Sequence, residues 1–139
     1  MINTAGAAQV IYTMKVLSMH PDLQEKARED VLQVFGRKAP DFDGLNHLKI
    51  VAMILYEVLR LYPLIVLLIR GTNKKMKLGE VILPPGTEIA LQTLLVHRDL
   101  GLWGEDVKEF NSERFSGGVS KATRICLGQS FALIESKML

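Results

Sequence analysis

The sequence predicts a mainly α-helical fold with a small β region. Apolar residues recur at helical spacing in three segments, residues 5–19, 21–36 and 48–62, as expected for helices that each bury one face. Between residues 64 and 91 this periodicity gives way to short apolar runs separated by glycine and proline, a pattern typical of strands and turns. With 48% hydrophobic and 23% charged residues in 139 positions, the chain has the composition of an ordinary globular domain.

The helices are expected to begin and end at residues suited to helix termini. The helix over residues 5–19 is so apolar that we expect it to be buried over much of its surface. Pro21 suits the first position of the next helix, and Gly36 suits the turn that ends it. A polar connector over residues 37–44 leads to the third helix, which Pro63 ends.

Short strands are expected after the third helix, at Leu64–Thr72, Met76–Leu78, Val81–Leu83 and Thr87–Leu91. The apolar run Leu64–Ile69 predicts a buried strand, because it is far too short to span a membrane. Residues 92–96 fit either a strand or a helix. The chain from there to residue 115 is rich in loops, with a short polar helix expected after Gly104.

Charge and cysteine content exclude several classes of protein. The formal net charge is +2, and the basic cluster Lys74–Lys77 is too short to indicate a nucleic-acid partner. The single cysteine excludes an internal disulfide. No apolar run has the length of a transmembrane segment, and the first residues lack the basic region of a signal peptide, so we expect no membrane anchor within these residues.

Glu57 and Arg60 form a charged pair within the third helix. They are three residues apart and therefore lie on the same helix face, among apolar neighbours such as Ile54 and Val58. A solvated pair of this kind would contribute roughly 0.2–0.5 kcal/mol. A buried pair needs further acceptors, because a guanidinium has more donors than one carboxylate can accept.

Cys126 lies between Arg124, two residues before it, and Gly128, two residues after it. A metal-bound thiolate needs hydrogen-bond donors, and the apolar residues Phe131–Ile134 predict a helix whose N-terminal N–H groups would stabilise the sulfur. Arg124 could bind a carboxylate, and Gly128 would let the backbone approach a flat cofactor. The alternative is that Cys126 is a small buried hydrophobic residue.

Three signals stand in a fixed order: Glu57-x-x-Arg60, then Ser112-Glu113-Arg114-Phe115, then Arg124-x-Cys126-x-Gly128. In this order they closely resemble the C-terminal part of a cytochrome P450, a haem-thiolate monooxygenase. Nearly the whole chain takes part in the likeness, so we expect residues 1–139 to form a partial cytochrome P450 domain, from the end of the distal helix through the cysteine loop. Pro40–Leu45 and Gly128–Ala132 resemble the plant 72A-type group most.

The resemblance implies roles for the residues of these motifs. Glu57, Arg60 and Arg114 would form a buried structural triad that maintains the core around the haem. Cys126 would be the axial ligand of the haem iron. No residue of this chain is assigned as a catalytic acid or base.

The resemblance also implies a cofactor site and partners. Arg124 and Arg70 match positions that bind haem propionates, with Gly128 also at the cofactor, and Leu64–Leu68 would line a pocket for a lipophilic substrate. Electrons would come from NADPH through NADPH–cytochrome P450 reductase, at the endoplasmic reticulum membrane.

The chain departs from the family pattern near the cysteine. Val119 and Ala122 replace the usual phenylalanine and glycine of the haem loop, and we expect poor local order from Gly117 to Thr123. No acid accompanies Thr4, where the family has an acid–threonine pair that delivers protons to oxygen. We therefore expect the isolated chain not to oxidise a substrate, and the alternative is a non-catalytic truncated or mis-spliced product with no haem bound.

A third hypothesis makes Cys126 a nucleophile with His97 or His47 as its base. Against it, His97 stands in a His-Arg-Asp segment that has a structural role in the family, and His47 lies among polar residues. The sequence contains neither a glycine-rich phosphate loop nor two histidines at metal-ligand spacing on one helix face.

Overall fold

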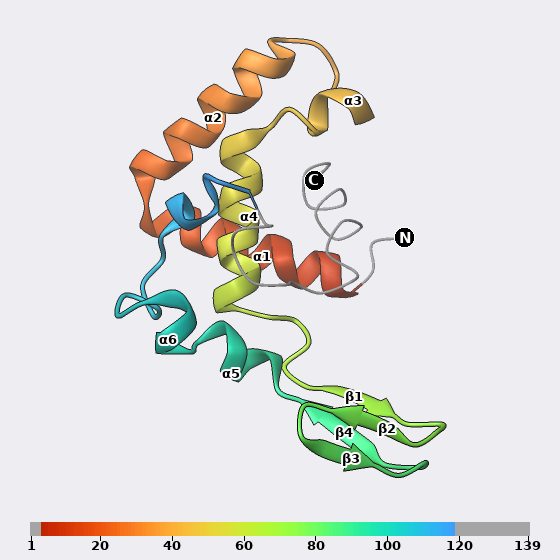
Figure 1. The fold of residues 1–139 in the computed structure, drawn as a ribbon. Helices are drawn as coiled ribbons and strands as arrows, with labels where there is room; N and C mark the ends of the chain where they lie inside the picture. Colours follow the sequence, from red (N-terminus) through yellow and green to blue (C-terminus); the bar gives the residue numbers. More distant parts are fainter. Residues whose placement is uncertain (1–3, 119–139) are drawn as a thin grey trace.

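The structure, a computed structural model, describes residues 4–118 as long helices, then two small sheets, then short helices (Figure 1). The mainly α fold class with a small β region is thereby confirmed. In chain order the elements are α1 (Thr4–Met19), α2 (Pro21–Phe35), α3 (Phe42–Leu45), α4 (Lys49–Leu61), β1 (Leu68–Gly71), β2 (Met76–Leu78), β3 (Val81–Leu83), β4 (Glu88–Leu91), α5 (Thr93–His97), α6 (Leu100–Trp103) and the 3₁₀ helix η1 (Ser112–Phe115).

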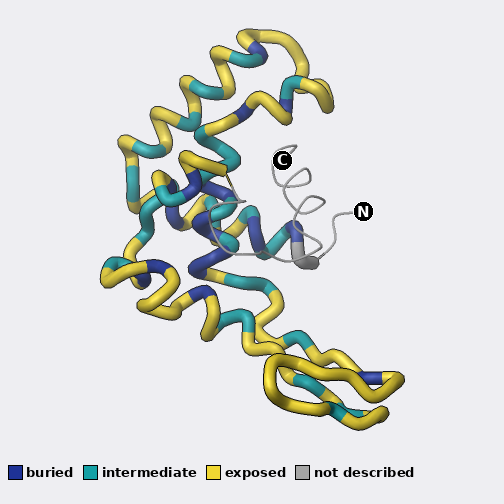
Figure 2. Tube along the Cα trace, viewed as in Figure 1, coloured by how far each residue is buried: buried dark blue, intermediate teal, exposed yellow. Residues whose placement is uncertain are grey.

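Helix α4 is the centre of the helical part. Helices α1, α2 and η1 all pack against it, and buried positions gather along it in Figure 2. One apolar cluster joins Val16 of α1 to Ile54 and Val58 of α4. Two further clusters pack against residues of α4; their buried members are Phe35, Leu45 and Leu48 in one, and Trp103, Val107 and Phe115 in the other. The core therefore surrounds the helix that carries Glu57 and Arg60.

Helix α1 buries a narrower face than its sequence predicts. Gln9 and Val16 are buried, and Gln9 Nε2 donates to the carbonyl of Leu55 on α4 at 3.2 Å. Ile11 and Met14 are each 65% exposed, so the expectation that most of this helix is buried is wrong. The main contacts of α1 among the described elements are with α4 and α2, and Ile11 and Met14 lie away from them.

Helix α4 receives its N-terminal cap from another helix. Its own N-cap residue, Leu48, makes no side-chain cap. Asp30 on α2 accepts hydrogen bonds from the backbone N–H groups of Ile50 at 2.9 Å and Val51 at 3.2 Å. Because the first N–H groups of a helix have no partner within it, this carboxylate both satisfies them and holds α2 against α4.

The connector after α2 contains one short helix that the sequence analysis missed. Gly36 ends α2 at φ 59°, as predicted, with its N–H donating to the Leu32 carbonyl at 2.8 Å. Helix α3 then begins inside the segment expected to be irregular, where the Asp41 carboxylate accepts from Gly44 N at 2.7 Å. This cap gives a partner to an N–H group at the start of the helix, where no earlier carbonyl is available.

The sheets are antiparallel pairs, with the β2–β3 hairpin lying between β1 and β4 in the chain. Strand β1 pairs with β4 from Leu68↔Leu91 to Gly71↔Glu88, and β2 pairs with β3 from Met76↔Leu83 to Leu78↔Val81. The strands predicted at residues 76–78, 81–83 and 87–91 are confirmed, with the last beginning at Glu88. The sheets lie beyond the lower end of α4 in Figure 1.

The buried strand predicted over residues 64–69 is wrong. Only Leu68–Gly71 of the expected Leu64–Thr72 strand pairs with a neighbour, and Ile65, Val66, Leu67 and Ile69 are between 43% and 58% exposed. The four residues of β4 all pair with the four residues of β1, and no described strand pairs with residues 64–67.

The last helices differ from the expectation in position. Residues 93–97 form α5, the helical alternative for that segment. The polar helix expected after Gly104 is wrong, because residues 105–108 form turns. A short helix, α6, lies before Gly104 instead, and the Asp99 carboxylate at its start accepts from Leu102 N at 2.9 Å. Gly104 adopts φ 88° and ends this helix.

Candidate functional site

The Glu57–Arg60 pair lies inside the core on α4. Both side chains are fully buried. Arg60 binds the carboxylate in two parallel hydrogen bonds, from Nε to Oε2 and from Nη2 to Oε1, each at 2.7 Å. This bidentate geometry is among the strongest that a guanidinium forms with a carboxylate.

The remaining donors of Arg60 all reach backbone carbonyls of later segments. Nη1 donates to His97 O at 3.0 Å and Val107 O at 2.7 Å, and Nη2 donates to Glu109 O at 3.3 Å. All five N–H donors of the guanidinium are therefore used. The extra acceptors required by a buried pair come from residues that follow Arg60 by 37 to 49 positions in the sequence.

Trp103 packs on the same guanidinium. The Arg60 Cζ atom lies 5.0 Å from the centre of the Trp103 ring system, within the range of a cation–π contact. The indole N–H donates to Val96 O at 2.9 Å, and the residue is only 8% exposed. The ring thereby fixes the corner between α5 and α6 and shields Arg60 from water.

Arg114 approaches Glu57 from η1. Its Nη1 donates to Trp103 O and its Nη2 to Asp106 O, each at 2.8 Å, and Nη2 also forms an ion pair with the Asp106 carboxylate. The Arg114 Nε atom lies 3.5 Å from Glu57 Oε1, an ion-pair distance rather than a good hydrogen bond.

Glu57 Oε1 is the atom at which these contacts meet. It accepts from Arg60 Nη2 at 2.7 Å and from the backbone N–H of Asn111 at 3.0 Å, and it faces Arg114. The structure thus brings Glu57, Arg60 and Arg114 together, and we call them, with Trp103, the arginine cluster. The cluster joins α4 to α5, α6 and η1.

Asp106 forms an ion pair with Arg114 at the edge of the cluster. Its side chain is 44% exposed and pairs with Arg114, whose side chain is only 12% exposed. The hydrogen bond from Arg114 holds the pKa of the Asp106 carboxyl below its usual value of 3.8. Asp106 was interpreted from the sequence as part of a solvated helix face, and neither Asp106 nor Trp103 was assigned a contact with the arginine pair, because both lie more than 40 positions from Glu57.

His97 is a buried histidine beside the cluster. It is 5% exposed, its backbone carbonyl accepts from Arg60, and its ring Nδ1 has no hydrogen-bond partner among residues 4–118. Burial lowers the pKa of His97 from the usual 6.5, and the charge of Arg60 acts in the same direction. Its buried position beside Arg60 does not suit a base in an open site, and the other proposed base, His47, is exposed.

The other residues expected at a cofactor lie apart from the arginine cluster. Arg70 is exposed on β1, and its side chain has no hydrogen bond or ion pair with another described residue. Cys126, Arg124 and Gly128 lie outside the described residues, as does most of the Gly117–Thr123 segment expected to be poorly ordered. Within residues 4–118 no group of three metal-ligating side chains occurs, and no helix is both long and apolar enough to cross a membrane.

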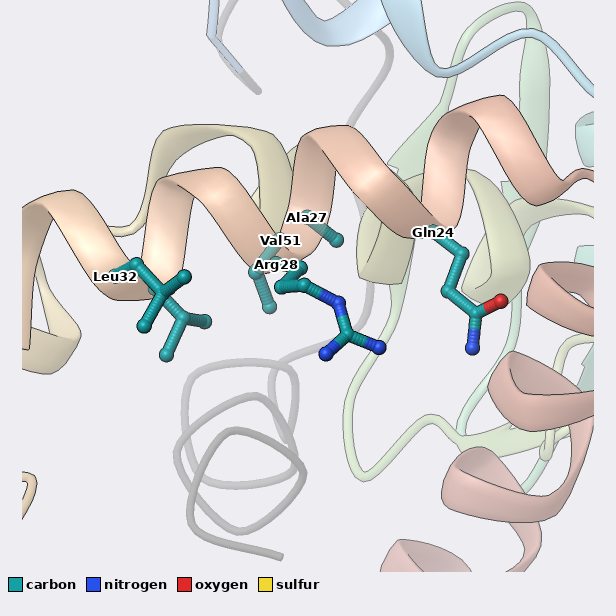
Figure 3. A pocket seen from close by; sticks show the side chains of 6 residues that line it. Gln24, Ala27, Arg28, Leu32 and Val51 are labelled. Atoms are coloured by element: carbon teal, nitrogen blue, oxygen red, sulfur yellow. The ribbon is translucent and has the colours of Figure 1, made fainter.

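A groove of about 310 Å³ opens between α2 and α4 (Figure 3). It is lined by Gln24, Ala27, Arg28, Val31, Leu32 and Val51. Arg28 is its only charged residue, and it pairs with Glu25 in an exposed contact of 3.5 Å. The groove brings no second titratable group to Arg28, so it offers no arrangement for acid–base chemistry.

Comparison of the sequence with known proteins identifies its family. A family model described as "Cytochrome P450" matches residues 7–139. "Cytochrome P450 72A397" of Kalopanax septemlobus is 53% identical over 93% of this chain and 27% of its own length, and "11-oxo-beta-amyrin 30-oxidase" of Glycyrrhiza uralensis is 50% identical over 96% and 28%. "Cytochrome P450 72A15" of Arabidopsis thaliana is 52% identical over 93% and 28%. The chain therefore spans a little over a quarter of the length of these relatives.

Proposed function

The chain belongs to the cytochrome P450 family, and we propose that it forms the haem-thiolate-binding part of a plant monooxygenase of the 72A type. In this proposal Cys126 ligates the haem iron, and Arg124 and Arg70 bind the propionates. Gly128 lies at the cofactor, where a residue without a side chain lets the backbone come close.

The observation that carries the proposal is the arginine cluster. Arg114 stands at the end of the described chain, on η1, and is tied to Glu57 and to the carbonyl of Trp103. The cysteine segment follows η1 in sequence, so a rigid η1 gives that segment a fixed starting point. We assign Glu57, Arg60 and Arg114 a positioning role, because their hydrogen bonds run to one another and to backbone groups of later segments, and none of them lines the groove between α2 and α4.

The residues present fit a haem group in their chemistry. Haem offers an iron that a thiolate can bind and propionates that pair with guanidinium groups. Arg70 is exposed and without a side-chain partner among the described residues, as a residue reserved for an anionic group would be. When bound, the haem would supply oxygen activation, with electron density donated by the thiolate.

We propose a lipophilic small molecule as the substrate. Two of the relatives carry the name 11-oxo-beta-amyrin 30-oxidase. In this chain the apolar residues Ile65, Val66 and Leu67 are 43–52% exposed rather than packed in the core. Such a surface suits the wall of an apolar pocket, because lipophilic ligands bind mainly by burying apolar area. The electron donor would be NADPH–cytochrome P450 reductase, at the endoplasmic reticulum membrane.

A second candidate is a non-catalytic product that binds no haem. The substitutions Val119 and Ala122 in the haem loop favour it, as does the absence of an acid beside Thr4. The two candidates differ in whether this chain forms a stoichiometric complex with haem.

Haem titration followed by the fluorescence of Trp103, the single tryptophan of the chain, tests the proposal. Specific binding predicts saturable quenching at one haem per chain, weakened in Cys126→Ser and in Arg70→Ala. Lys74→Ala, which removes a nearby exposed cation, is the matched control for Arg70→Ala and should bind haem like the parent chain. Quenching that never saturates, or that is equal in all four proteins, would favour the second candidate.

A further inference from the structure

Tyr12 and Tyr62 form a stacked pair that the proposed function does not use. Tyr12 lies on α1 and Tyr62 follows the last residue of α4. Their ring centroids are 5.0 Å apart and their planes differ by 1°. The residues are 38% and 37% exposed, so solvent and small oxidants reach both rings.

The packing of α1 on α4 holds the two rings in place. The Gln9 side chain, one turn before Tyr12, donates to the Leu55 carbonyl on α4 at 3.2 Å. Val16, one turn after Tyr12, is buried in a cluster with Ile54 and Val58. The pair therefore sits between two fixed contacts, and its separation is a property of the folded chain.

The third tyrosine of the chain provides a contrast. Tyr56 is largely covered, and its ring lies 5.4 Å from that of Phe115 rather than beside another phenol. Burial raises the pKa of Tyr56, which makes loss of its phenolic proton harder. Only the Tyr12–Tyr62 pair combines exposure with a second phenol in contact.

We propose that Tyr12 and Tyr62 are an oxidative cross-linking site, at which a peroxide-driven haem peroxidase produces an intramolecular dityrosine. Each phenol loses one electron and one proton to become a phenoxyl radical. The two radicals couple through the ring carbons ortho to the oxygens, and both rings regain aromaticity as the ortho hydrogens return to the oxygens as protons. The two electrons and two protons released reduce one hydrogen peroxide to two waters through the peroxidase.

The test exposes the full chain to a haem peroxidase and limiting hydrogen peroxide, under reducing analysis so that Cys126 disulfides do not count. The expected product is a monomer with dityrosine fluorescence, whose peptide map links residue 12 to residue 62. Its yield should not depend on protein concentration. Tyr12→Phe and Tyr62→Phe should each lower the monomer fluorescence at least ten-fold, whereas Tyr56→Phe should leave it unchanged.

Two results would overturn the proposal. One is equal fluorescence in all three phenylalanine variants, and the other is a product made only of cross-linked dimers. The phenylalanine variants keep the apolar ring, and unchanged far-ultraviolet circular dichroism would show that they fold. The same reaction in urea should lose the 12–62 linkage, because only the fold brings the two rings together.

Discussion

Removing the negative charge of Glu57 should destabilise this chain far more than the small change in side-chain structure suggests. In Glu57→Gln the shape of the side chain is kept, but Arg60 and Arg114 lose the carboxylate that both of them face. Both partners of the Glu57–Arg60 pair are fully buried, and breaking such a pair costs about 3–5 kcal/mol. The free energy of unfolding of a domain is about 5–15 kcal/mol, so the substitution should remove a large fraction of it.

Urea unfolding measured by circular dichroism checks this magnitude. With a urea dependence of about 2 kcal/mol per molar, a loss of about 4 kcal/mol lowers the midpoint by about 2 M. Glu25→Gln is the matched control, because Glu25 and Arg28 have the same spacing on α2 but are 64% and 63% exposed. Its effect should stay below about 1 kcal/mol. Equal midpoint shifts in the two variants would refute the argument that burial of the pair determines its contribution.

Three further changes probe other contacts of α4 and of the segments that pack against it. Asp30→Ala removes the side chain on α2 that caps α4 and should lower the free energy of unfolding by about 1–2 kcal/mol. Asp22→Ala, at an exposed position in the first turn of α2, should lower it less in the same urea assay. The pKa of His97 is lowered in the folded chain, so near and below pH 6.5 the unfolded chain binds more protons, and the free energy of unfolding should decrease as the pH is lowered. His97→Gln should flatten this dependence on pH in a series of thermal melts. An unchanged slope would contradict the lowered pKa of His97. Trp103→Phe loses the indole donor to Val96 and weakens the contact with Arg60, so it should lower the free energy of unfolding by roughly 1–3 kcal/mol. A decrease as small as that of Leu102→Ala, at an exposed neighbouring position, would contradict a stabilising role for these two contacts.

Much of the fold is readable from local sequence patterns. The periodicities that predict α1, α2, α4 and the β2–β3 hairpin reflect contacts each segment makes along one face or with its nearest neighbour. The short helices α3 and α6 escaped prediction because single aspartates, Asp41 and Asp99, start them rather than a periodic apolar face. A cap of this kind leaves only one residue as a signal in the sequence.

The misread segments depend on what surrounds them in space. Residues 64–67 have the composition of a buried strand, but pairing is limited to the four residues of β1. Ile11 and Met14 fit a buried helix face, yet α4 packs against another side of α1. An apolar sequence indicates where burial is favourable, and the partners that provide it are encoded elsewhere.

The arginine cluster was accessible from sequence only in part. The spacing of Glu57 and Arg60 placed them on one helix face, their apolar neighbours indicated that a buried pair would need further acceptors, and resemblance to a family supplied Arg114. The acceptors themselves are backbone carbonyls of His97, Val107 and Glu109, and any residue provides a carbonyl. Contacts of this kind leave no compositional signal, so only the folded chain identifies them.

The most direct test of the haem-thiolate assignment is the absorption spectrum of the haem-loaded chain after reduction and carbon monoxide binding. A thiolate ligand shifts the main absorption band of this complex to longer wavelength than an imidazole or a vacant axial position does. The account predicts the thiolate-type band in the parent chain and its loss in Cys126→Ser. A band that is the same in both proteins would contradict the assignment of Cys126 as the iron ligand.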